Sequence, residues 1–257
     1  MASRIALFLE AWHQRRAKER WARLASVAPE LESFDLRALR AEARSMRRAL
    51  DRMLHVADAR LAVPFPGAGL PQMPLGTDWS WRPDPWRGAL AEPGGLAPGD
   101  RTSLAEGLAL HHDCPLGEII ARQVRNDKAE DRATYGLAID VFGFKGSFLS
   151  LALDLPDQAV RGLRTRHLVR AEFVVESDRP IRGFARLNIK HGPNLAQSVS
   201  SLPEDGRNKV AQFDLACVDL DVKRIEHAWL DLILNDPAMN RVVIRDIVIS
   251  RSPRAEL

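Results

Sequence analysis

The sequence has little cysteine and no long apolar run, and each scarcity excludes a class of protein. Cys114 and Cys217 are the two cysteines, and neither has a CxxC partner, which excludes a disulfide framework and a cysteine zinc site. The apolar run from Ile5 to Leu9 ends at Glu10 and is too short for a signal-peptide core. No segment approaches the ~20 apolar residues that a membrane span needs. We therefore expect a cytoplasmic protein whose thiols are reduced or buried.

Motifs for common cofactor chemistry are also missing. The sequence contains no Walker loop, no dinucleotide-binding fingerprint and no nucleophile elbow. The glycines of FPGAGLPQMPLG lie among prolines rather than between a strand and a helix, so they do not cradle a phosphate. We expect no cofactor, and no motif names a reaction.

Residues 1–61 carry the pattern of two helices. Ile5, Phe8, Trp12, Trp21 and Leu24 give a helical stripe, and Pro29 separates it from a second segment. The second segment repeats apolar residues at intervals of three and four, the spacing of a helix that buries a narrow seam against another helix. We predict an antiparallel helical hairpin whose seam packs on the first helix, on the rest of the chain or on a second copy. The seam consists of Leu36, Leu39, Ala43, Met46, Leu50, Met53 and Ala57.

The second predicted helix is also basic, and residues 1–60 hold 13 Lys and Arg against 8 Asp and Glu. This face is interpreted in three ways: a solvated helix surface, attachment to an anionic membrane surface, or binding of an acidic partner. Membrane attachment would place the protein at the periphery of the inner membrane. Nucleic acid is disfavoured, because acidic residues interrupt the patch and no aromatic-basic motif accompanies it. The face consists of Arg37, Arg40, Arg44, Arg47, Arg48 and Arg52.

Residues 62–100 form a segment rich in proline, glycine and tryptophan. They hold 8 of the 16 prolines and 7 of the 16 glycines, a density that no helix or central strand tolerates. Trp79, Trp81 and Trp86 lie in DWSWRPDPW, and a disordered linker rarely keeps three tryptophans. We predict an extended arm whose tryptophans pack onto the next domain; the alternative is an exposed aromatic platform for a ligand.

Residues 101–257 have the pattern of many short strands. Nine alternating or apolar segments, from LALHH at 108–112 to RVVIRDIVIS at 241–250, are separated by Gly, Pro, Asp and Asn. Residues 144–147 resemble a tight hairpin turn, and 156–162 and 219–224 are expected to hold short helical turns. The predicted fold class is α+β: a helical hairpin (1–61), an arm (62–100) and an antiparallel, jelly-roll-like β-sandwich (101–257).

The strand segment FARLNIKHGPN carries the strongest indication of a ligand site. Arg186, Asn188 and Lys190 share one face of this strand, opposite an apolar face. Trp229 and Asp231 share one face of HAWLDLILN, so strands in one sheet would place cations and amides beside an aromatic ring, the mixture that binds sugars. The alternative is a buried Trp229, an internal Arg186–Asp231 pair and a plain Gly-Pro turn. The candidate ligand-binding residues are Arg186, Asn188, Lys190, His191, Asn194, Trp229 and Asp231, with His191 and Asn194 at the rim.

Two catalytic hypotheses are weaker. His111 and Asp113 share a strand face, and His191 could complete a metal site, but nothing in the sequence brings it near, so we expect no metal. Carboxylates such as Asp140 or Asp231 could make a glycan-processing hydrolase, yet they stand singly among basic neighbours, as surface ion pairs do.

The runs HDCPLGEIIARQVRN, FKGSFLSLALDLP, RLNIKHGPN and SRSPRAEL resemble a bacterial protein family of unknown function along nearly the whole chain. That resemblance implies no catalytic residue. The strand pattern of residues 101–257 is similar to the jelly-roll sandwiches of carbohydrate-binding modules and galactose-binding-like domains. We expect a non-enzymatic module that binds a glycan or a similar polar ligand. The alternatives are an assembly protein that binds other proteins, a second copy included, and a hydrolase.

Overall fold

The computed structural model describes residues 4–61, 73, 76–90, 94–97, 99–128 and 130–254. For the helical residues 4–14, 48, 51, 52 and 54–61 it describes the backbone alone, so the side chains of Ile5, Phe8, Trp12, Arg48, Arg52 and Ala57 lie outside the described part. Two compact units divide the chain, one of residues 1–53 and one of residues 54–257.

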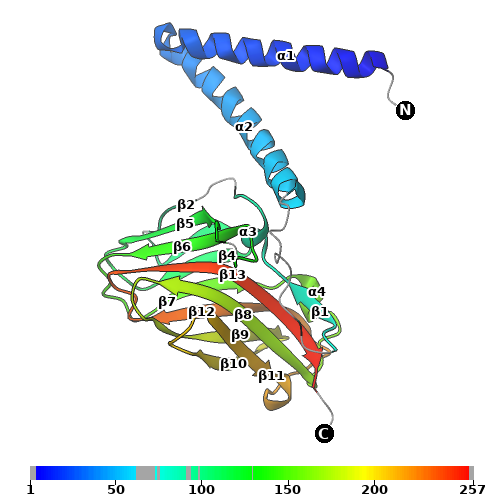
Figure 1. Cartoon of the computed structure of the whole chain (residues 1–257), viewed down its shortest axis with the longest axis vertical. Coiled ribbons are helices and arrows are strands. Elements are labelled where there is room, and N and C mark those ends of the chain that lie inside the picture. Colours follow the sequence, from blue (N-terminus) through cyan, green and yellow to red (C-terminus); the bar gives the residue numbers. More distant parts are fainter. Residues whose placement is uncertain are drawn as a thin grey trace. The chain divides into compact units, whose positions relative to one another are not determined.

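The predicted helices lie in the first unit, except for residues 54–61 at the end of the second helix. α1 spans Arg4–Val27, a 3-10 turn spans Ala28–Glu30, and α2 spans Ser33–Leu61 (Figure 1). Near the turn, Trp21 Nε1 donates to Met46 Sδ at 3.0 Å and Arg20 pairs with Glu42 at 3.3 Å. Leu36, Met46, Leu50 and Met53 are exposed, so what covers the rest of the seam stays a prediction. No helix in the described residues is long and apolar enough to cross a bilayer.

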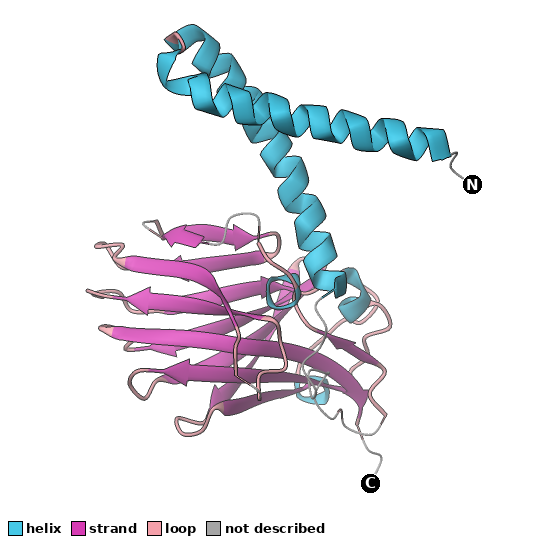
Figure 2. Ribbon diagram, turned by 45° about the horizontal axis from the view of Figure 1, so that its top comes forward, coloured by secondary structure: helices cyan, strands magenta, loops and turns pink. Residues whose placement is uncertain are grey.

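The second unit is an antiparallel β-sandwich, which confirms the predicted fold class (Figure 2). Within the described residues, one sheet has seven strands and the other six. Sheet A consists of β1 (Trp79–Trp81), β2 (Gly94–Leu96), β5 (Ile119–Arg125), β6 (Tyr135–Val141), β8 (His167–Ser177), β11 (Asn208–Asp214) and β13 (Asn240–Pro253). Its strand order is β11-β8-β13-β6-β5-β2, and β1 pairs with β13. Sheet B, in the order β10-β9-β12-β7-β4-β3, consists of β3 (Arg101–Ala105), β4 (Leu108–His112), β7 (Leu149–Asp154), β9 (Arg182–His191), β10 (Asn194–Leu202) and β12 (Ile225–Asn235).

The core lies between the two sheets, because alternate residues of the strands are apolar and face inward. On β8, the inward residues Val169, Ala171 and Phe173 are at most 5% exposed, and the residues between them are half-buried. β12 contributes Leu230 and Leu232 in the same way. The opposite faces of both sheets are therefore left for polar side chains.

Part of the proline-rich arm belongs to the sandwich. β1 pairs with β13, β2 pairs with β5, and the one-turn helix α3 (Asp84–Arg87) lies between them. Trp86 is completely buried in the core and its Nε1 donates to the carbonyl oxygen of Ile244 at 2.9 Å. Trp79 and Trp81 are half-buried against the same core with their rings stacked. The tryptophans thus pack on the next domain, as predicted, whereas residues 62–72, 74, 75, 91–93 and 98 of the arm lie outside the described part.

Two local predictions need correction. Residues 144–147 do not close a hairpin, because β6 before them belongs to sheet A and β7 after them belongs to sheet B. Of the predicted helical turns, 156–162 contains α4 (Asp157–Val160). Residues 219–224 form a hydrogen-bonded turn, in which the Arg224 amide donates to the Asp221 carbonyl oxygen at 3.1 Å, but not a helix; a 3-10 turn lies earlier, at Leu215–Cys217. Strand β10, which pairs with β9 across the Gly192-Pro193 turn, was missed.

We expect Trp86→Ala to lower the free energy of unfolding by about 3–5 kcal/mol, the usual cost of truncating a buried large aromatic side chain. Trp86→Phe, the matched control, keeps most of the ring and should cost about 1–3 kcal/mol for the unpaired Ile244 carbonyl. Urea unfolding of both variants measures the difference. Equal, small effects would contradict the burial of this ring in the sandwich.

A cluster of polar side chains, in which Arg251 and His167 are buried and Asp78 is exposed, fastens the arm to the end of β13. Arg251 donates from Nε to Asp78 Oδ1 at 2.9 Å and from Nη1 to the carbonyl oxygens of Ala159 and Arg161, both at 2.9 Å. His167 is 4% exposed, accepts a hydrogen bond at Nδ1 from the Arg164 amide, and has Nε2 3.9 Å from Asp78 Oδ2. Burial and the Arg251 guanidinium lower the pKa of His167, although Asp78 opposes them, and Arg164 and Arg166 act with Arg251.

Because the folded pKa of His167 is depressed, the unfolded chain binds this proton more tightly. The neutral ring therefore contributes stability above its ordinary pKa of 6.5, and that contribution is lost as the pH falls toward the folded pKa. We expect the melting temperature to fall as the pH is lowered from 8 to 5.5. This pH range lies above the ordinary pKa values of Asp and Glu, so their titration does not contribute. His167→Asn, whose side-chain oxygen can replace Nδ1 as acceptor, should show a smaller fall. The same fall in both proteins would contradict the assignment.

Candidate functional site

The candidate site is the outer face of sheet B, where β9 and β12 are direct neighbours. Asp231 lies opposite Arg186, and Trp229 lies opposite Asn188. These residues point away from the core because Leu187, Leu230 and Leu232 occupy the inward positions between them. The structure therefore places the cationic and amide side chains of β9 beside the tryptophan and carboxylate of β12.

β7, the second neighbour of β12, has a small side chain on the outer face of the sheet and leaves space there. Ala152 of β7 lies opposite Asp231, and Ala109 of β4 lies opposite Ala152. Small side chains thus form a floor between the bulkier residues of β12 and β3, and an open groove runs over them. We call its two parts the polar half and the apolar half, according to the side chains that line them.

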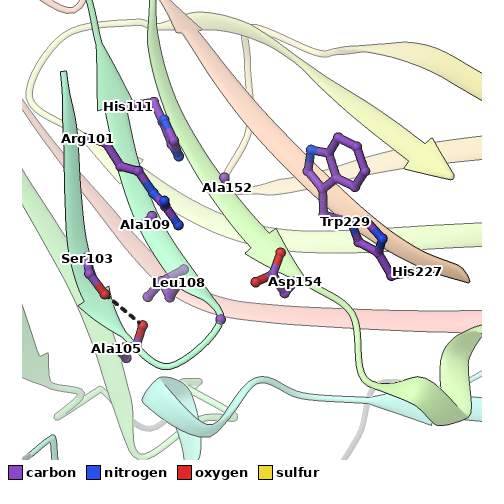
Figure 3. A pocket seen from close by; sticks show the side chains of 11 residues that line it. Arg101, Ser103, Ala105, Leu108, Ala109, His111, Ala152, Asp154, His227 and Trp229 are labelled. Atoms are coloured by element: carbon purple, nitrogen blue, oxygen red, sulfur yellow. Dashed lines mark hydrogen bonds between the residues drawn. The ribbon is translucent and has the colours of Figure 1, made fainter. Parts of the chain in front are cut away.

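The polar half is a hollow of about 230 Å³ (Figure 3). Arg101 and His111 lie on one side of it, Trp229 and His227 lie on the other, and Asp154 lies between. Asp154 and Arg101 are exposed, and neither forms an ion pair with the residues that the structure describes. This half therefore presents a free cation and a free carboxylate. Its polar lining residues are Arg101, Ser103, His111, Asp154 and His227.

The apolar half is larger, at about 520 Å³, which is within the range of small-molecule sites. Phe148, Phe184 and Ile233 line it, with Ser150 at its floor. Trp229, His111 and Ala152 line both halves, so the two hollows form one continuous groove.

Trp229 and His227 form an aromatic surface beside the polar half. Their ring centroids are 5.1 Å apart and the ring planes differ by 18°, so the rings stack along β12. Trp229 is half-buried and His227 is exposed. The indole is thus held in place while part of its surface remains open, as a stacking platform for a ligand requires.

Asp231 is the centre of a buried network rather than a free acceptor. Its Oδ2 accepts from Arg186 Nε at 3.0 Å, from Arg186 Nη2 at 2.9 Å and from Asn188 Nδ2 at 2.9 Å. Asn188 is completely buried and its Oδ1 accepts from Gln197 Nε2 at 2.7 Å. The predicted Arg186–Asp231 pair therefore exists, and it fixes the wall of the groove, where the Arg186 side chain is still 38% exposed.

The remaining predicted residues do not line the groove. Lys190 donates to the Gly192 carbonyl at 2.9 Å. His191 is 5% exposed and its Nδ1 accepts from the Asp221 amide at 3.3 Å. His191 continues the inward series of Leu187 and Ile189, and Asn194 lies opposite it in the β9–β10 pair, so neither residue rims the outer face. The His-Gly-Pro-Asn corner is a turn, with Gly192 at a φ of +58° that favours glycine.

The structure also separates the predicted catalytic groups. Asp140 lies on β6 in sheet A, where it pairs with Arg122 at 3.3 Å and Arg241 at 3.5 Å, so it and Asp231 belong to different sheets. Asp113 accepts from the Ser147 hydroxyl and the Ser147 and Phe148 amides, which lowers the pKa of its carboxyl. Within the described part of the chain, no three His, Cys, Asp or Glu side chains are grouped as metal ligands.

Several lining residues were missed by sequence reasoning. Arg101 and Ser103 lie on β3, which the pattern did not mark as a strand, Asp154 was interpreted only as one of the single strand carboxylates, and His227 gave no signal of its own. They come together only through the β3-β4-β7-β12 order, which places residues of distant segments in one row.

Comparison with known proteins identifies the family but no activity. The whole sequence, residues 1–257, matches a family described as "Family of unknown function (DUF6478)". The chain belongs to this family. No protein with a curated description matches the sequence.

Among solved structures, the family 11 carbohydrate-binding module from Clostridium thermocellum is 13% identical with a TM-score of 0.39, over 64% of this chain and 98% of that one. The xylan-binding domain from Paenibacillus barcinonensis is 10% identical with a TM-score of 0.38, over 65% and 100%. The enzymatically active domain of a tailspike protein from bacteriophage CBA120 is 7% identical with a TM-score of 0.40, and the match spans 62% of this chain and 21% of that one.

We expect Asp231→Ala to lower the free energy of unfolding by about 1–3 kcal/mol, because it removes the partner of Arg186 and the shortest of the three hydrogen bonds that the buried Asn188 Nδ2 donates. The partly exposed Arg186 can turn to water, which keeps the loss below that of a fully buried pair. His227→Ala, the matched change at an exposed outward position of β12, should cost less than ~1 kcal/mol. Urea unfolding of the two variants compares them, and the reverse order would contradict the division between framework and exposed residues.

Proposed function

We propose that the groove on the outer face of sheet B binds a glycan without cleaving it. The observation that carries this proposal is the open Trp229–His227 surface beside the free Arg101 and Asp154 side chains, along one continuous groove. A sugar ring presents an apolar face of C–H groups and a rim of hydroxyls. The aromatic surface suits the ring face, and guanidinium and carboxylate groups suit the hydroxyls as donor and acceptor.

Binding is favoured over hydrolysis by the state of the carboxylates. Asp154 and Asp231 are the two carboxylates among the described lining residues of the groove. Glycosidases use two such groups in complementary roles on either side of the scissile bond. Asp231 is 5% exposed and already accepts three hydrogen bonds, so Asp154 alone is available to a ligand. One free carboxylate suits recognition better than that reaction.

The helices concern partners other than the glycan. Because seam residues of α2 are exposed, self-association through this helix stays a prediction. Because Arg37, Arg40 and Arg44 are exposed, binding of an anionic membrane surface or of an acidic partner also stays a prediction. An assembly protein that binds other proteins remains the second function of the chain to be tested.

A glycan array tests the proposal with the full-length protein. We expect wild type to bind a defined subset of glycans and Trp229→Ala to lose about tenfold or more in affinity, because it loses the stacking surface. Trp229→Phe should retain part of the affinity. Val199→Ala, which changes an exposed apolar residue of β10 outside the groove, should bind as wild type does. Absence of any specific signal with wild type would contradict glycan binding and favour a protein partner.

A further inference from the structure

The two halves of the groove differ in chemistry, and the difference restricts the ligand. The polar half offers charged and hydroxyl groups, whereas Phe148, Phe184 and Ile233 in the apolar half offer no hydrogen bond. His111, Arg186 and Asp231 also line the apolar half, where Asp231 already accepts from Arg186 Nε, Arg186 Nη2 and Asn188 Nδ2. A sugar that carries only hydroxyls would leave the apolar half poorly matched, and a wholly apolar molecule would leave the polar half unused.

Ser150 provides a second, independent observation. It lies on β7 opposite Ile233 of β12 and His111 of β4, on the floor of the apolar half. The residue is 94% buried, being 6% exposed, and its Oγ has no hydrogen-bond partner among the residues that the structure describes. A buried hydroxyl without a partner is unfavourable, so a ligand atom that pairs with it gains more than it would at an exposed serine.

We propose that the groove selects a glycan with N-acylated amino sugars, whose acyl group enters the apolar half. This inference rests on the proposed function and adds the class of sugar. The acyl carbonyl oxygen accepts a hydrogen bond from Ser150 Oγ, and the short alkyl end lies against Phe148, Phe184 and Ile233. An acyl group joins an acceptor to an apolar end within a few bonds, which is the combination that this half presents.

Trp229 connects the two parts of the ligand. Because Trp229 lines both halves, a sugar ring stacked on it has one edge toward the polar half, with Asp154 and Arg101, and the other toward the apolar half, with Ser150. The sugar hydroxyls thus face the charged groups while the acyl substituent faces the apolar side chains. One stacked ring uses the whole groove in this arrangement.

The test compares tetra-N-acetylchitotetraose with cellotetraose, two glycans that share one backbone and carry on each sugar either an N-acetylamino group or a hydroxyl. A glycan array containing further pairs of this kind identifies the best backbone, and titration calorimetry on the full-length protein measures both members. We expect wild type to prefer the N-acetylated member by about tenfold or more. Ser150→Ala should weaken binding of that member by about 3- to 10-fold, the effect of one hydrogen bond, and leave the hydroxyl member unchanged.

Folding does not confound this variant. Ser150→Ala removes a buried hydroxyl that has no partner among the described residues, so the melting temperature should be equal to that of wild type or higher. Ser201→Ala, at an exposed serine of β10 outside the groove, is the matched control and should bind as wild type does.

Three outcomes would contradict different parts of these proposals. Equal binding of both members of every pair overturns the acyl assignment and leaves glycan binding standing. A preference for the N-acetylated member that survives Ser150→Ala overturns the role of Ser150. Absence of binding to any glycan on the array overturns both this inference and the proposed function.

Discussion

The mutual burial of two apolar sheet faces determines everything else in the sandwich. Side chains alternate along a strand, so once Leu187 and Leu230 point into the core, Arg186, Asn188, Trp229 and Asp231 must point out. A slip of one residue between β9 and β12 would bury the charged set and expose the apolar one. The composition of the groove is thus a consequence of core packing, and the free energy that holds the groove together comes mainly from residues that never contact a ligand.

The same burial draws the proline-rich segment into the fold. Trp86 fills the core beside Ile244, and Asp78 pairs with Arg251 at the end of β13, so both ends of DWSWRPDPW are fixed. Prolines and glycines prevent this segment from forming a long strand, and a short strand, a helical turn and another short strand satisfy its backbone instead. The segment has the composition of a linker, but its described part belongs to the sandwich, because three tryptophans supply the apolar area that a linker lacks.

Local patterns predicted more of this molecule than long-range ones. The heptad spacing of α2 and the alternation of β8, β9 and β12 are readable because each depends on neighbours a few residues apart. The hairpin at residues 144–147 was wrong because turn chemistry says nothing of which sheet the next strand joins. At the site, alternation alone placed Arg186 and Asn188 correctly, and it should also have placed His191 inward, since His191 follows Leu187 and Ile189 on the same face. Arg101 and Asp154 required the strand order, which no single segment encodes.

The groove owes its shape to rigid strands rather than to loops. Asn188 and Asp231 are buried and hydrogen-bonded, so they hold Arg186 at one wall, and the stacked His227 restrains Trp229. Small side chains on β7 and β4 form the floor of the groove, so the groove is open without a conformational change. A ligand that enters therefore orders few protein groups, which lowers the entropic cost of binding. Specificity must then come from the few groups left unsatisfied, namely Arg101, Asp154 and Ser150. Arg101 lies on β3, and Asp154 and Ser150 lie near opposite ends of β7, so a ligand that satisfies all three must span the groove from the free carboxylate to the buried hydroxyl.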